Sequence, residues 1–81
     1  MEASKRLLNL PGHKLRVFRV GETDMIGVCY DGADIKEGIM RVGEYGIGVS
    51  FEEACQDYLN KISGKTIIFG YGDEREEIKV L

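Results

Sequence analysis

The chain has 81 residues, a formal net charge of −3 and a hydrophobic content of 43%. A single small domain spanning residues 1–81 is expected at this length, with little room for a deep substrate cavity. The apolar content excludes a disordered chain, and no apolar run approaches the about 20 residues that span a membrane. The charged first ten residues and two cysteines outside a CxxC pair favour a cytoplasmic protein with free thiols.

Charge is distributed unevenly along the sequence. Residues 1–20 carry a net charge of +4, whereas residues 21–81 carry −7. Such asymmetry can attract a charged partner, or a basic first strand can lie beside an acidic one so that the charges neutralise each other. Direct binding of nucleic acid by Lys14, Arg16 and Arg19 around Phe18 is a weaker alternative, because the isoelectric point is near 5.1.

The first half of the chain alternates short apolar runs with turn residues. An EF-hand calcium loop is excluded at DGADIKE because the acidic residues lack the required register. The expected elements before the helix are, in chain order, a short helix within 1–10, strands at 14–20 and 25–30, a solvated acidic turn at 31–37, a third strand at 39–42 and a glycine-rich connection at 43–48.

The second half begins with a well-defined amphipathic helix. Ser50 is expected at its N-cap, with Glu53 three residues later completing a capping box. Gly64 supplies the residue that ends it. The apolar positions follow helical spacing and comprise Phe51, Ala54, Cys55, Tyr58, Leu59 and Ile62. Strands are expected at 66–69 and 77–81, on either side of a GYGD turn.

These elements predict an α+β fold, with an antiparallel sheet of four to five strands and one main helix on one face. The strands carry apolar residues on both faces, although only one face has a certain helix to cover it. Either the N-terminal segment or another chain must cover the second face, and a homodimer is the favoured explanation. The residues assigned to this second face are Phe18, Val20, Met25, Cys29 and Ile68.

The sequence offers little equipment for catalysis. His13 is the sole histidine and is expected in a surface turn, so no catalytic, metal or cofactor site is predicted and the protein is not expected to be an enzyme. The glycine-rich loop before the helix leaves a small nucleotide-binding domain as an alternative. Acidic side chains around that loop oppose a bound phosphate.

Acidic residues spread over the second and third strands suggest a different role. Such a surface can occupy a basic, nucleic-acid-binding groove on another protein, or it can serve solubility alone. The residues assigned to partner binding are Glu22, Asp24, Asp31, Asp34, Glu37 and Glu44.

Two resemblances accompany these residues. The segment GVSFEEA at 48–54, with strands before it and a helix and strand after it, resembles the core of HicB-type antitoxins, which implies binding of a small toxin. The segments FEEACQDYLNKISGKTIIF and EREEIKVL resemble short reading frames of Firmicutes prophages. Small acidic proteins of that kind are similar in type to anti-CRISPR inhibitors, which implies a non-enzymatic inhibitor of a host protein such as a defence nuclease.

Overall fold

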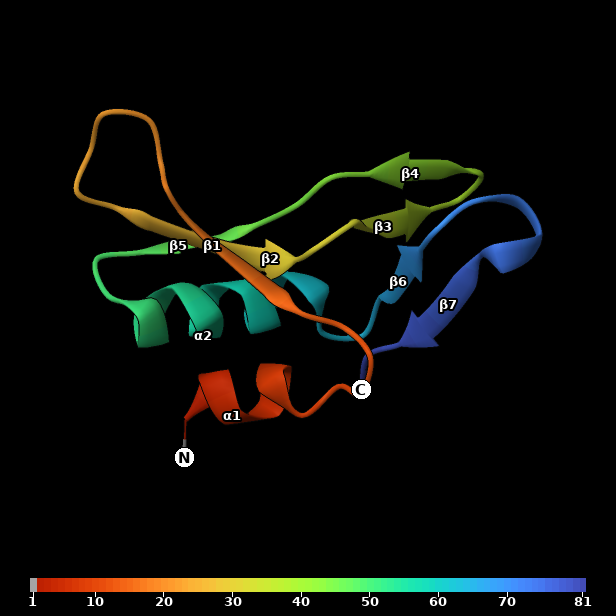
Figure 1. Cartoon of the computed structure of the whole chain (residues 1–81), viewed down its shortest axis with the longest axis horizontal. Coiled ribbons are helices and arrows are strands. Elements are labelled where there is room, and N and C mark those ends of the chain that lie inside the picture. Colours follow the sequence, from red (N-terminus) through yellow and green to blue (C-terminus); the bar gives the residue numbers. More distant parts are fainter. Residues whose placement is uncertain (1) are drawn as a thin grey trace.

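A computed structural model describes residues 2–81. Within these residues, two helices and seven strands form an α+β fold with one main helix, as predicted (Figure 1). The helices are α1 (Ala3–Leu8) and α2 (Phe51–Ile62). The strands are β1 (Leu15–Arg19), β2 (Ile26–Tyr30), β3 (Ala33–Glu37), β4 (Met40–Val42), β5 (Gly46–Gly48), β6 (Thr66–Phe69) and β7 (Glu76–Lys79), with a short 3-10 helix, η1 (Gly72–Glu74), before β7.

The strands form two antiparallel sheets, whereas one sheet of four to five strands was predicted. Sheet A has the order β1-β2-β5, and sheet B has the order β4-β3-β6-β7. Figure 1 shows the two sheets side by side along the long axis of the molecule, with α1 and α2 on the same side. The division occurs at Asp31–Gly32, where Gly32 has a φ of 75° and redirects the chain from sheet A into sheet B.

The acidic segment at 31–37 is mostly a strand, and not the turn that was predicted. Ala33 and Ile35 point inward against Phe69 and Ile67 of β6, while Asp34 and Lys36 point outward. Only two apolar residues mark this alternation, so the sequence pattern indicates the strand weakly. Gly38, with a φ of 63°, then provides the tight turn into β4.

Helix α2 confirms the predicted N-cap at Ser50, but within residues 2–81 no hydrogen bond joins the Glu53 side chain to the Ser50 amide to complete a capping box. The Ser50 side chain accepts a hydrogen bond from the Glu53 amide at 3.2 Å, and Gly64 follows the helix with a φ of 78°. The buried face of α2 contributes Ala54, Cys55, Tyr58, Leu59 and Ile62 to the core.

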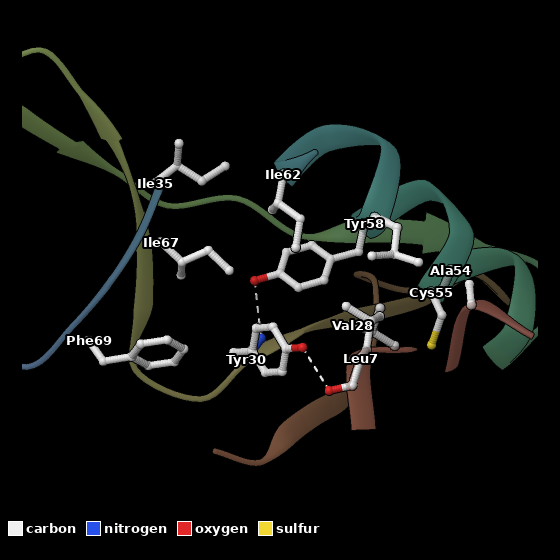
Figure 2. Close-up of a cluster of buried hydrophobic side chains, with 12 residues drawn as sticks. Leu7, Val28, Tyr30, Ile35, Ala54, Cys55, Tyr58, Ile62, Ile67 and Phe69 are labelled. Atoms are coloured by element: carbon white, nitrogen blue, oxygen red, sulfur yellow. Dashed lines mark hydrogen bonds between the residues drawn. The ribbon is translucent and has the colours of Figure 1, made fainter. Parts of the chain in front are cut away.

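The core joins the inner sides of both sheets to the two helices. Figure 2 shows Tyr30 of sheet A between Tyr58 of α2 and Phe69 of sheet B. The Tyr30 amide donates to the Tyr58 hydroxyl at 3.2 Å, and the Tyr30 hydroxyl donates to the Leu7 carbonyl at 2.7 Å. These bonds satisfy the polar groups of two large buried side chains and tie α1 to the inner side of sheet A.

Two glycines allow α2 to lie directly on β5. A Cβ atom at Gly46 would lie 2.2 Å from the Ala54 carbonyl oxygen, and one at Gly48 would lie 2.6 Å from the Ala54 amide nitrogen. The glycine-rich connection predicted at 43–48 therefore contains a strand whose glycines permit close packing of the helix backbone.

Candidate interaction surface

The outer face of sheet A is the side turned away from α1 and α2. Residues opposite each other on paired strands share a face, so the register places Phe18 beside Gly27 and Gly27 beside Ile47. Arg16 is likewise paired with Cys29. With the residues that continue these rows, the outer face of sheet A consists of Arg16, Phe18, Val20, Met25, Cys29, Tyr45 and Ile47.

Aromatic and basic side chains form a row across this face. The Phe18 ring lies over Gly27, where an added Cβ would meet the ring at 2.4 Å. The Tyr45 ring meets Phe18 edge-on with 5.4 Å between centroids. The Arg16 guanidinium lies 5.6 Å from the Phe18 ring centre, and the Lys61 ammonium lies 5.8 Å from that of Tyr45.

Side chains on this face remain partly open to solvent. Phe18, Cys29 and Ile47 are half-buried, and Tyr45 is 40% exposed. The N-terminal segment does not cover them, because α1 packs against α2 on the inner side. The second face predicted from the sequence is therefore present and uncovered by α1.

Sheet B closes its corresponding outer face with its own side chains. Ile68 lies between Asp34 and Glu77 in the register and is fully buried. Arg41 pairs with Asp34 at 3.0 Å and donates to the Gly70 carbonyl at 2.6 Å, while its guanidinium stacks over Tyr71. This arrangement covers Ile68 with charged and aromatic groups.

Four of the five residues assigned to the second face therefore come together. Phe18, Val20, Met25 and Cys29 lie on the outer face of sheet A. Ile68 was grouped with them incorrectly, since it belongs to sheet B and its own chain covers it.

The six acidic residues assigned to partner binding do not form one patch. Asp34 pairs with Arg41, Glu37 lies 3.7 Å from Lys65, and Glu44 lies 3.9 Å from Lys61. The remaining three have no ion pair within residues 2–81 and sit near opposite ends of β2, namely Glu22 and Asp24 in the β1–β2 loop and Asp31 after β2.

The basic first strand is not neutralised by its neighbour, contrary to one expectation from the charge pattern. β1 pairs with β2, which contains no acidic residue. Within the described part of the chain, none of Lys14, Arg16 and Arg19 forms an ion pair, and all three are exposed.

Ionisable groups in the fold have shifted pKa values with clear causes. Burial raises the pKa of the Cys55 thiol to about 11 and those of Tyr30 and Tyr58 to about 12. Burial also raises the pKa of the Cys29 thiol, which the nearby Arg16 opposes. Both thiols are free, and neither is activated as a nucleophile.

Asp57 holds the outer edge of β5. Its carboxylate accepts a 2.8 Å hydrogen bond from the Ile47 amide and pairs with Lys61 at 3.0 Å. The hydrogen bond from the Ile47 amide is the main cause of the lowered pKa of Asp57, and Lys61 lowers this pKa further. An amide of the glycine-rich connection is thus occupied by a carboxylate of the protein.

His13 lies in a more packed position than its sequence suggests. Its ring stacks on Phe69 with centroids 3.7 Å apart, and its Nε2 lies 2.8 Å from Glu76. No sequence signal indicated this contact, because Phe69 is 56 residues away.

Among residues 2–81, no cluster of three His, Cys, Asp or Glu side chains suited to a metal ion occurs. Nor is any helix of this region long and apolar enough to cross a membrane. No protein-family model matches the chain, and comparison with curated proteins and with solved structures gave no significant match.

Proposed function

We propose that this chain is a non-enzymatic binding protein that engages another protein through the outer face of sheet A. The observation that carries the proposal is the row of Phe18, Tyr45 and Ile47 on a sheet face that neither helix covers. An aromatic and aliphatic centre bordered by charges is typical of protein interfaces. The face combines such a centre with Arg16 and Lys61 beside the rings.

Acidic residues around this face refine the proposal. Glu22 and Asp24 lie beyond one end of the face, and Asp31 lies beyond the other. These three exposed carboxylates would meet basic groups at the rim of the partner. Asp34, Glu37 and Glu44 instead serve ion pairs within the chain.

The partner class follows the sequence resemblances. A phage-encoded inhibitor of a host protein, such as a nucleic-acid-binding defence nuclease, fits an apolar contact with acidic ends. A HicB-like role would use the same face for a small toxin. A homodimer would instead join this face to its copy.

Capture from a host lysate tests the proposal when variants of matched size are compared. Tyr45→Ala removes an aromatic ring from the outer face of sheet A, and Tyr71→Ala removes one from the outer face of sheet B. We expect a protein that the wild type and Tyr71→Ala retain and that Tyr45→Ala loses, confirmed by titration with the purified protein. Equal retention by all three forms, or no retained protein, would reject this face as the binding site.

Sedimentation velocity separates the homodimer from the other partners. A species of 9.1 kDa at high concentration would be a monomer and would exclude self-association as the role of the face. A dimer that Tyr45→Ala dissociates would assign the face to a second copy.

A further inference from the structure

β1 exposes one complete edge of sheet A. The Asp31 amide donates to the Lys14 carbonyl at 2.8 Å, and the Val20 amide donates to the Met25 carbonyl at 3.0 Å. Because antiparallel bonds alternate along a strand, Arg16 and Phe18 make the bonds between these two points. The backbone groups of Leu15, Val17 and Arg19 therefore point away from β2, and within residues 2–81 β1 pairs with β2 alone.

The other edge strands are shorter or already occupied. β1 has five residues, whereas β7 has four and β4 and β5 have three each. The Asp57 carboxylate takes the Ile47 amide at the edge of β5. β1 is thus the best available template for another strand.

The charge of β1 indicates what such a strand would contain. Lys14, Arg16 and Arg19 are exposed and form no ion pair within the described residues. Val17, between the two arginines, is 55% exposed. Opposite charges on neighbouring strands attract, and like charges repel. A second copy added as a strand would bring three more cations to the same edge.

We propose that the free edge of β1 accepts an extended, acidic segment of a partner protein as a fourth strand of sheet A. The segment's main chain would pair with the outward groups of Leu15, Val17 and Arg19, and its carboxylates would lie beside the cations of β1. This inference rests on the proposed function, because it specifies how part of a partner protein is held. It uses an edge of sheet A, whereas the proposed function uses its outer face.

A synthetic peptide provides the probe. The peptide is a capped, fluorescently labelled heptapeptide that alternates glutamate with valine, and its matched control replaces every glutamate with glutamine. Fluorescence anisotropy at low ionic strength should show the glutamate peptide binding about tenfold more tightly than the glutamine peptide, and added salt should reduce the difference. Hydrogen exchange should slow at the amides of Leu15, Val17 and Arg19 when the peptide is bound.

Two variants separate main-chain pairing from simple charge attraction. Val17→Pro removes an outward amide that has no hydrogen-bond partner within residues 2–81, so it should weaken the affinity for the glutamate peptide about tenfold, while Val17→Thr should not. The double variant Arg16→Gln with Arg19→Gln tests the contribution of the charges without changing the backbone. It also keeps the inference testable if Val17→Pro does not fold. It should reduce the preference for glutamate over glutamine, because only Lys14 remains of the three cations.

The opposite results overturn the inference. Equal affinity for the two peptides, or unchanged exchange at the outward amides, would reject an acidic strand at this edge. A competition with oligothymidylate of equal charge gives a further test. The inference would also be rejected if this oligonucleotide displaced the peptide and bound Val17→Pro with the same affinity as the wild type, because phosphate binding needs no strand pairing. If the glutamate peptide does not bind, the edge proposal fails, but capture of a partner that depends on Tyr45 can still support the proposed function. If the peptide binds and no Tyr45-dependent partner is captured, only the proposed function is rejected.

Discussion

Sheets A and B have similar inner sides, but the side chains of their outer faces are covered to different extents. Both inner sides join one core with α2, in which Tyr30 contacts both Tyr58 and Phe69. On the outside, sheet B covers Ile68 with Arg41 and its partners, whereas sheet A leaves Phe18 and Tyr45 half-open. The outer face of sheet B is therefore covered by charged groups, whereas the outer face of sheet A exposes aromatic side chains.

The largest effect is expected from forcing α2 away from the inner side of sheet A. Gly46→Ala places a Cβ against the backbone of α2, so it should lower the free energy of unfolding by about 3 kcal/mol or more. Gly43→Ala is the matched control, because its Cβ would meet nothing closer than 3.9 Å and should change stability by less than about 0.5 kcal/mol. Urea denaturation measures both, and equal stability of the two variants would contradict the packing role of Gly46.

The second largest effect is expected from removing Arg41 from the outer face of sheet B. Arg41→Ala leaves Asp34 and the Gly70 carbonyl without their partner and uncovers Ile68, which should cost about 2 kcal/mol. Arg16→Ala on sheet A loses only a contact with Phe18 and should cost less than about 1 kcal/mol. Similar losses in urea denaturation would show that the two outer faces do not differ as described.

Alkaline pH tests whether the inner sides form one unit. Because burial raises the folded pKa values of Tyr30 and Tyr58 from 10.0 to about 12, both tyrosines stabilise the fold below pH 10. That contribution should be lost as the pH rises from 10 towards 12, and Cys55 should begin the loss above pH 9. Thermal melting from pH 8 to 12 should give one falling transition, and two separate transitions would indicate that the sheets unfold independently.

The smallest effect is expected at the centre of the open face. Gly27→Ala forces the Phe18 ring aside and should cost about 1 kcal/mol, because the ring can turn towards solvent. Its contact with Tyr45 should weaken, which proton NMR detects as altered ring-current shifts. Unchanged Tyr45 resonances would show that the ring does not rest on Gly27.

Local signals in the sequence were sufficient to predict α2, its caps and most strands. Ser50, Glu53 and Gly64 act on their own neighbours, so their roles can be deduced without the fold. The sequence does not indicate β5, because Gly46 and Gly48 have low strand propensity. Glycine is needed at both positions because a Cβ there would clash with α2. The division into two sheets depends on pairings between distant segments, such as Ala33 with Phe69.

The candidate surface could be predicted only in part. Alternation within β1 and β2 correctly placed Phe18 and Cys29 on one face. The same alternation put Ile68 on an outer face but gave no information about which sheet it would join or that Arg41 would cover it. The ion pairs that divide the acidic residues likewise depend on side chains distant in sequence, such as Glu37 and Lys65.

The two thiols of this chain occupy opposite sides of sheet A. Cys29 is half-buried in the outer face, whereas Cys55 is fully enclosed under α2. A maleimide dye or spin label applied to the native protein would therefore attach at Cys29 first and place a reporter within the surface assigned to partners. Loss of partner capture after labelling at Cys29 would place the contact on this surface without any substitution.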